Sequence, residues 1–101
     1  MKLIKLTQDG EIVGYTFHCP GCKSEHSVWT EKPNSNGAKW TFNENLEAPT
    51  FSPSLMISYS GLEKRWICHS SISDGQITFL SDCSHDLAGK TVMIPDFEDY
   101  R

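Results

Sequence analysis

The chain has 101 residues, of which 38% are hydrophobic, and it carries a formal net charge of −4. This length and composition predict one globular domain over residues 1–101 and exclude an extensively disordered chain. The nine Lys and Arg residues are scattered, so this acidic chain lacks the general attraction to phosphate that nucleic-acid binders need. We therefore expect no nucleic-acid partner.

The beginning of the chain does not have the pattern of a targeting segment. Its apolar run, residues 3–6, is interrupted by Lys5 and is too short for a signal peptide or a membrane span. We expect a cytoplasmic protein without a membrane partner. In a reducing cytosol, the four cysteines are more typical of metal ligands than of disulfides.

Short β-strands, separated by Gly, Pro, Asn and Ser, are predicted along the whole chain. The run over residues 11–19 is the clearest, because Val13, Tyr15 and Phe17 alternate onto one face. The expected strands cover residues 3–6, 11–19, 26–30, 39–43, 55–60, 65–73, 76–83 and 91–95. A long irregular segment is expected over residues 44–54, a turn over 61–64, at most one helical turn over 84–89, and a loose tail over 96–101. The predicted fold class is a small all-β domain, mostly antiparallel and barrel-like, with an ordered core over about residues 3–95.

The stretch CPGCKSEH places two thiols three positions apart across a Pro-Gly turn, with an imidazole at its end. Cys19 and Cys22 in this spacing are typical of a zinc knuckle, which supplies half of a tetrahedral site. Because a chain of this size has a modest core, a bound metal would be a useful source of stability.

A β-hairpin is predicted at Asp74-Gly75, because this dipeptide supplies the positive φ angles of a type I′ turn. With a two-residue loop, residues 65–73 and 76–83 pair in even step, and Cys68 and Cys83 become diagonal neighbours on one face. Their Cβ atoms then lie about 7 Å apart or closer, near the reach of two thiolates on one zinc ion.

The predicted cofactor is therefore a structural Zn²⁺ ion. Two histidines compete as ligands, so that three cysteines with His26 or His85 form an alternative site. The competing interpretation is four unrelated cysteines buried as small apolar side chains, and a disulfide pair is a third. The predicted ligands are Cys19, Cys22, Cys68 and Cys83.

The same hairpin pairing places His69 on the opposite face, with Asp82 diagonal to it. A carboxylate can fix the tautomer of an imidazole and stabilise its charged form, which gives the base and the orienting group of a nucleophile set. The hydroxyl would come from PTFSPS, where Thr50, Ser52 and Ser54 are candidates, and Ser54 stands where a Pro-rich loop enters a strand. We take Ser54, His69 and Asp82 as the candidate catalytic residues. The competing interpretation is a surface hydrogen bond and turn-forming serines.

Five stretches occur in an order that resembles a known family: FHCPGCKSEH, WTFN, PTFSPS, CHSSISDGQITFLSDCSHDLAG and IPDF. The family consists of small phage and bacterial proteins related to the BubE-like domain of bacterial ubiquitin-like conjugation operons. The operon-encoded relatives look like serine-type peptidases that release a ubiquitin-like modifier. Their Pro-Ser nucleophile region falls on Pro53-Ser54 of this chain. Their His lies in a Cys-x-x-His stretch, whereas Cys68 and His69 are adjacent here.

Three hypotheses about function follow. The first is a zinc-stabilised serine peptidase or isopeptidase that acts on a ubiquitin-like or other protein substrate in a bacterial or phage-infected cell. The second is a non-catalytic module that binds a protein or peptide partner through exposed residues such as Trp29 and Tyr59. In the third, His26 or His85 leaves the zinc an open position, and the metal activates water.

Overall fold

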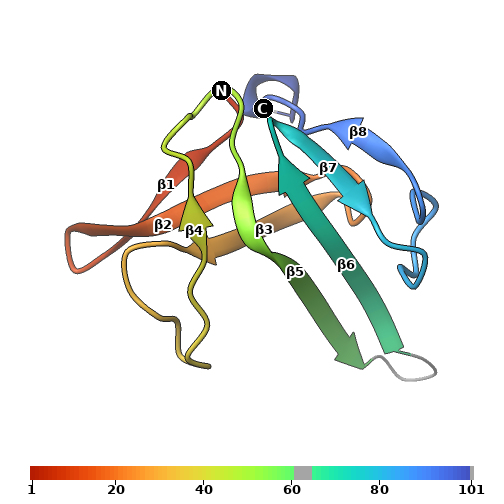
Figure 1. The fold of residues 1–101 in the computed structure, drawn as a ribbon, viewed down its shortest axis with the longest axis horizontal. Coiled ribbons are helices and arrows are strands. Elements are labelled where there is room, and N and C mark those ends of the chain that lie inside the picture. Colours follow the sequence, from red (N-terminus) through yellow and green to blue (C-terminus); the bar gives the residue numbers. More distant parts are fainter. Residues whose placement is uncertain (61–64, 101) are drawn as a thin grey trace.

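The protein folds as two antiparallel β-sheets (Figure 1), in a computed structural model that describes residues 1–60 and 65–100. One sheet has three strands in the order β1-β2-β3, and the other has five in the order β4-β5-β6-β7-β8. The strands are β1 (Ile4–Gln8), β2 (Glu11–Cys19), β3 (Ser24–Trp29), β4 (Thr41–Phe42), β5 (Phe51–Ser60), β6 (Arg65–Ser73), β7 (Gln76–Phe79) and β8 (Thr91–Met93). The predicted all-β class is confirmed.

A single buried cluster joins the two sheets. Phe17 and Val28 enter it from the three-stranded sheet, and Phe51, Ile72 and Ile77 enter it from the five-stranded sheet. The alternation along β2 explains its share, because residues at every second position of a strand face the same side. Burial of these side chains contributes about 1.5–3 kcal/mol each, so the shared core holds the sheets face to face.

The cysteines lie inside this core. Cys19 at the end of β2 and Cys68 on β6 are both fully buried at 0% exposure, and each belongs to the cluster. One therefore comes from each sheet. Figure 1 shows β2 and β3 passing behind β5 and β6. The Cys19 and Cys68 side chains approach each other between the two sheets.

Several expected boundaries differ from the observed ones. The segment expected to be irregular already enters β5 at Phe51, and β7 ends at Phe79 instead of running to residue 83. Residues 84–89 form turns without a helix, and the turn predicted over 61–64 lies outside the described residues.

The segment over residues 97–100 is also not a loose tail. It forms a 3₁₀ helix, η1 (Phe97–Tyr100), in which Phe97 is 3% exposed and its N–H donates to the carbonyl of Met1. Within the described ranges, no helix is long and apolar enough to cross a membrane.

Candidate functional site

Four possible metal ligands converge where the two sheets meet. Cys19 and Cys22 flank the turn after β2, His26 lies on β3, and Cys68 lies on β6, with ligand atoms all within 4.8 Å of one another. The Sγ atoms of Cys19 and Cys68 are 3.9 Å apart. Two sulfurs bound to one tetrahedral zinc at about 2.3 Å lie about 3.8 Å apart. These residues could therefore hold one metal ion.

The knuckle turn is shaped by the backbone around Cys19. The N–H of Lys23 donates to the Cys19 carbonyl at 2.8 Å, and the N–H of Cys22 points at the Cys19 Sγ at 3.4 Å. Lys23 itself adopts a φ of 57°, which closes the turn before β3 begins. The indole N–H of Trp66, on β6, points at the Cys22 Sγ at 3.4 Å. Donors of this kind favour thiolates, the form in which cysteine binds a metal.

The histidine of this group has an orphaned nitrogen. The Nε2 atom of His26 is buried and has no hydrogen-bond partner among the described residues. A buried polar atom without a partner costs about 1–3 kcal/mol, so a bonding partner would stabilise this nitrogen. A metal ion held by the neighbouring thiolates would be such a partner.

The ionisation of the two central thiols is uneven. The adjacent Cys68 thiol, together with His26, lowers the pKa of Cys19. The contact with Cys19 and the burial of the site raise the pKa of Cys68. The site thus favours the thiolate of Cys19 and disfavours a second thiolate at Cys68. A divalent cation bound to both sulfurs would stabilise the two charges together.

A second group of possible ligands shares Cys68 with the first. It consists of Cys68, Cys83 and His85, whose ligand atoms also lie within 4.8 Å of one another. The four cysteines of the predicted site therefore do not form a single group, because Cys83 is gathered with His85 and not with the knuckle. His85 is buried and its Nε2 lacks a partner among the described residues.

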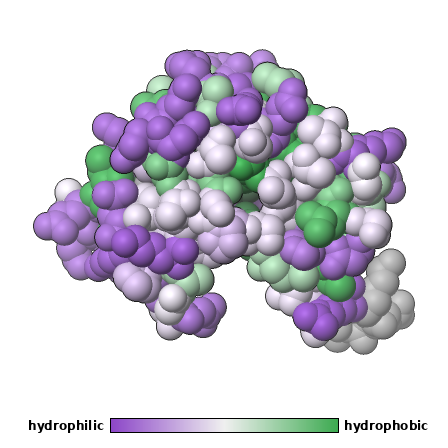
Figure 2. Space-filling view, in the orientation of Figure 1, coloured by the Kyte–Doolittle hydropathy of each residue, from purple (hydrophilic) through white to green (hydrophobic). Residues whose placement is uncertain are grey.

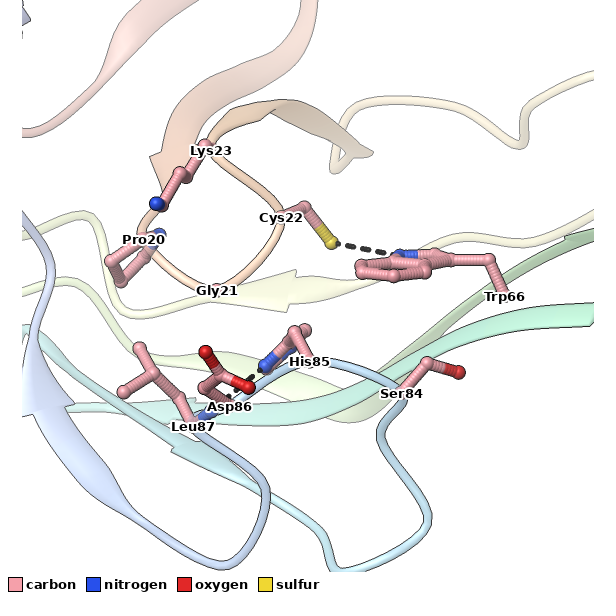
Figure 3. Close-up of a pocket in the computed structure, with 9 residues that line it drawn as sticks. All are labelled: Pro20, Gly21, Cys22, Lys23, Trp66, Ser84, His85, Asp86 and Leu87. Carbon is pink, nitrogen blue, oxygen red and sulfur yellow. Dashed lines mark hydrogen bonds between the residues drawn. The ribbon is translucent and has the colours of Figure 1, made fainter.

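His85 closes one side of a pocket at the knuckle (Figure 3), which has a volume of about 530 Å³. Its lining runs from Pro20 to Lys23 on the knuckle and from Ser84 to Leu87 on the facing loop, with Trp66 between them. The ring of His85 sits so close to Gly21 that a side chain at this position would collide with it. Ser54, His69 and Asp82 do not line this pocket.

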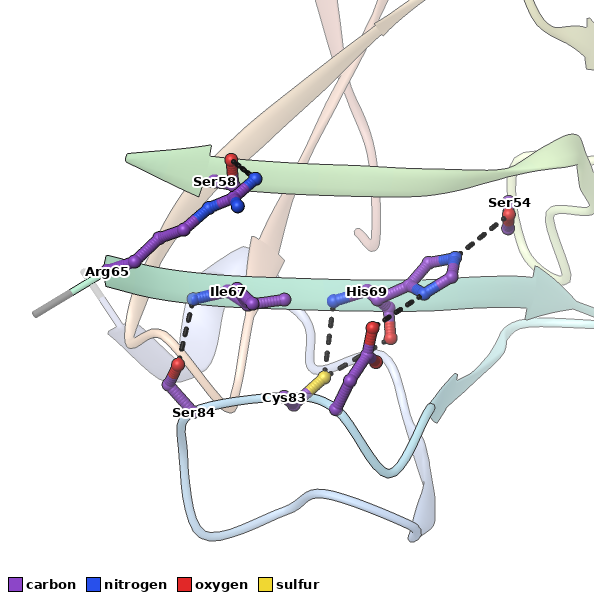
Figure 4. A network of polar contacts seen from close by, with 8 residues as sticks. Ser54, Ser58, Arg65, Ile67, His69, Cys83 and Ser84 are labelled. Atoms are coloured by element: carbon purple, nitrogen blue, oxygen red, sulfur yellow. Dashed lines mark hydrogen bonds and ion pairs between the residues drawn. The ribbon is translucent and has the colours of Figure 1, made fainter. Parts of the chain in front are cut away.

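Ser54 and His69 lie together on the outer face of the five-stranded sheet (Figure 4). Asp82 lies on the other side of the His69 ring. The Ser54 Oγ is 3.3 Å from the Nε2 of His69, and the Nδ1 of His69 is 3.4 Å from the Oδ2 of Asp82. The His69 side chain is 23% exposed and that of Asp82 is 49% exposed. The arrangement has the order of a nucleophile, a base and an orienting carboxylate, open to solvent on the carboxylate side.

A bulge presents the serine. Between Phe51 and Leu55, β5 advances by four residues while its partner β6 advances by two, from Ile72 to Ser70. Bulges re-aim side chains and are frequent beside active sites. Here the extra residues include Ser54, which is exposed, while Leu55 returns to the core.

The hairpin register is confirmed in its first half and wrong in its second. The predicted pairs at Ser73 and Ser71 occur, but the ladder ends with Ser70 opposite Phe79. The chain then turns over residues 80–83, so the expected pairs of residues 66–68 with 81–83 do not form. A proline-free polar turn of this kind gave no sequence signal strong enough to outweigh continued pairing.

The turn nevertheless brings Asp82 to His69, because Cys83 and Ser84 rejoin β6. The Cys83 Sγ accepts from the N–H of His69 at 3.2 Å and lies 3.2 Å from its carbonyl oxygen. Ser84 exchanges two bonds with Ile67: its N–H donates to the Ile67 carbonyl, and its Oγ accepts from the Ile67 N–H, both at 2.8 Å. These backbone and side-chain hydrogen bonds replace the ladder and hold the loop against β6.

A family model describes the same chain. The model for the bacterial ubiquitination-like system serine protease (BubE) matches residues 2–80. The chain belongs to the BubE family. The match includes Ser54 and His69 and ends before Asp82, Cys83 and His85. No curated protein and no solved structure matches the chain significantly.

Proposed function

We propose that this BubE-family domain is a serine-type peptidase or isopeptidase that acts on a ubiquitin-like or other protein substrate. The observation that carries the proposal is the 3.3 Å separation between the Ser54 Oγ and the His69 Nε2. A general base must lie within hydrogen-bond reach of the proton it takes, and such contacts are often slightly long before substrate binds. The serine protease family model supports the same reaction class.

In the proposed mechanism, the Ser54 Oγ attacks the carbonyl carbon of the scissile amide while the Nε2 of His69 takes the hydroxyl proton. Asp82 accepts a hydrogen bond from the Nδ1–H of His69 and stabilises the imidazolium that forms. The C–N bond then breaks as His69 returns the proton to the leaving amine, and an acyl ester remains on Ser54. Water, deprotonated by His69, hydrolyses this ester and restores the hydroxyl.

We propose that the metal is zinc and that Cys19, Cys22, Cys68 and His26 hold it. Thiolate and imidazole ligands in a tetrahedral set are typical of structural zinc, and four protein ligands leave no open position for water. No step of the reaction is assigned to it. The ion would join β2 and β3 to β6, and His69 directly follows the ligand Cys68 on β6. Zinc would thereby stabilise the strand that carries the base.

The experiment is covalent labelling with a small alkyl fluorophosphonate, in which a P–O bond to the serine forms and fluoride leaves. We expect one adduct per chain on Ser54, identified by peptide mass spectrometry. Ser54→Ala should abolish it. Ser52→Ala, which replaces another exposed serine two positions earlier, should keep it. Zinc-loaded, folded protein that reacts at no serine or at another serine would contradict the peptidase proposal and leave the non-catalytic binding module as the better account.

A further inference from the structure

The edge of β5 is open beside the candidate nucleophile. β4 pairs only with Phe51 and Ser52 at the beginning of β5. Figure 1 shows the short β4 beside that end of the strand. Beyond this point, no strand of the described ranges pairs with the same side of β5. We call residues 54–60 of β5, on the side away from β6, the open edge.

The backbone groups that face the open edge follow from the register. In an antiparallel ladder, the N–H and C=O of one residue point to the same side, and successive residues alternate. The carbonyls of Ile67 and His69 accept from the N–H groups of Ser84 and Leu80, which lie on the side of β6 away from β5. Ile67 and His69 therefore form non-hydrogen-bonded pairs with their β5 partners.

Those β5 partners are Ser58, opposite Ile67, and Met56, opposite His69. Their N–H and C=O groups must point away from β6 as well, towards the open edge. No described group forms a hydrogen bond with these four backbone groups. They are the donors and acceptors that another extended strand would need.

The open edge leads directly to Ser54. The chain leaves the ladder at Trp40, whose N–H bonds instead to the carbonyl of Trp29 in the other sheet. The indole N–H of Trp40 points at the Ser54 carbonyl at 3.4 Å, which closes the edge on this side of the serine. A strand laid along residues 54–60 would run for about 20 Å and would end at the nucleophile.

We propose that the open edge binds the substrate as an added β-strand, which presents its scissile carbonyl to Ser54. This inference rests on the proposed peptidase function and specifies its substrate class. The substrate is an extended polypeptide segment, such as an unfolded tail or an exposed loop, held mainly by backbone hydrogen bonds. Recognition through the backbone makes the length and extension of the segment matter more than the identity of each residue.

Side chains beside the edge leave room for such a strand. Met56 is 49% exposed and Tyr59 is 60% exposed, so apolar surface lies next to the free backbone groups. Arg65 donates to the Ser58 Oγ at 3.0 Å, on the outer face and not at the edge itself. Figure 2 shows a mainly polar surface in which such apolar patches are scattered.

The test uses a pool of peptides obtained by digesting a bacterial proteome, with cleavage products identified by mass spectrometry. The fastest-cleaved peptide is then resynthesised with one backbone amide N-methylated at a time. We expect losses of about fivefold or more at alternate positions on one side of the scissile bond, because every second amide faces the edge.

A proline substitution tests the protein side of the same bonds. Ser58→Pro removes an outward N–H, which an edge strand tolerates, and Ser58→Ala removes only the hydroxyl. We expect peptide cleavage by Ser58→Pro to be about fivefold or more below that by Ser58→Ala. Met93→Pro is the control. The N–H of the next residue, Ile94, donates to the Gly75 carbonyl across β7 and β8, so the N–H of Met93 points outward from the edge strand β8.

Fluorophosphonate labelling of Ser54 separates the two possible failures. Labelled protein that cleaves no peptide of the pool, that tolerates N-methylation at every position, or that responds equally to the three variants overturns the edge-binding inference alone. Absence of labelling in folded wild-type protein overturns the peptidase function, and the edge inference with it. Alternating losses together with a specific effect of Ser58→Pro establish it.

Discussion

Replacement of Asp82 by alanine tests the role of the carboxylate that faces His69. The substitution leaves the serine and the imidazole in place and removes the charge 3.4 Å from the Nδ1 atom. Because the Asp82 side chain is 49% exposed, water takes the vacated position without a buried cavity or a stranded polar group. The expected effect is therefore the lost attraction between the carboxylate and the imidazolium that forms during attack.

The size of this effect follows from the distance and the exposure. Two unit charges at this separation attract by about 1.2–2.4 kcal/mol when the effective dielectric constant is about 40–80, a range suited to a half-exposed pair. Such a loss slows a reaction by about 8-fold to 60-fold. The loss is far smaller than for a buried triad aspartate, because solvent already screens Asp82.

The assay is the second-order rate constant for fluorophosphonate labelling of Ser54, measured at one pH and one ionic strength. Asp86→Ala is the matched control, since Asp86 is an exposed carboxylate of the same loop with no contact to His69. Labelling by Asp82→Ala at the wild-type rate would refute an orienting role for Asp82. A loss above about 1,000-fold would refute the screened electrostatic account.

Three further predictions concern the scaffold. Removal of the proposed zinc ion with a chelator should unfold the domain, since metal binding and folding are coupled; near-UV circular dichroism that survives complete removal would contradict the structural role. Cys68→Ser should lose the metal, while Cys83→Ser should retain about one zinc per chain, measured by elemental analysis; equal retention would contradict the assigned ligand set. Gly14→Ala should lower the melting temperature by about 8 °C or more, because its Cβ would collide with the Val28 carbonyl in the adjacent strand; an unchanged transition would show that β2 and β3 can separate locally.

Much of the fold could be predicted because local signals agreed. The expected bounds of β2 and β6 match the observed ones, since alternation in β2 and the Asp74-Gly75 turn after β6 are both strong patterns. Asp74 and Gly75 adopt φ angles of 51° and 78°, as the type I′ turn requires. Residues 97–100 were wrongly predicted to be loose because the burial of Phe97 depends on a contact with Met1, far away in the sequence, which no local pattern encodes.

The candidate site could likewise be predicted only in part from the sequence. The nearness of His69 and Asp82 followed from an assumed ladder, but the structure reaches it through the turn over residues 80–83. That turn also withdraws Cys83 from the knuckle and brings His85 near Cys68. The position of His26 could be anticipated only as an alternative, because the choice between ligands depends on how the two sheets pack and not on spacing along the chain.

The role of His69 as the base is measured by comparing the labelling rate of Ser54 in wild-type protein and in His69→Ala, each with its zinc content confirmed. If His69 takes the serine proton, as the 3.3 Å contact implies, the variant should react at least about 100-fold more slowly while keeping its metal. Equal rates in the two folded, zinc-loaded proteins would contradict the account, because Ser54 would then react without the base.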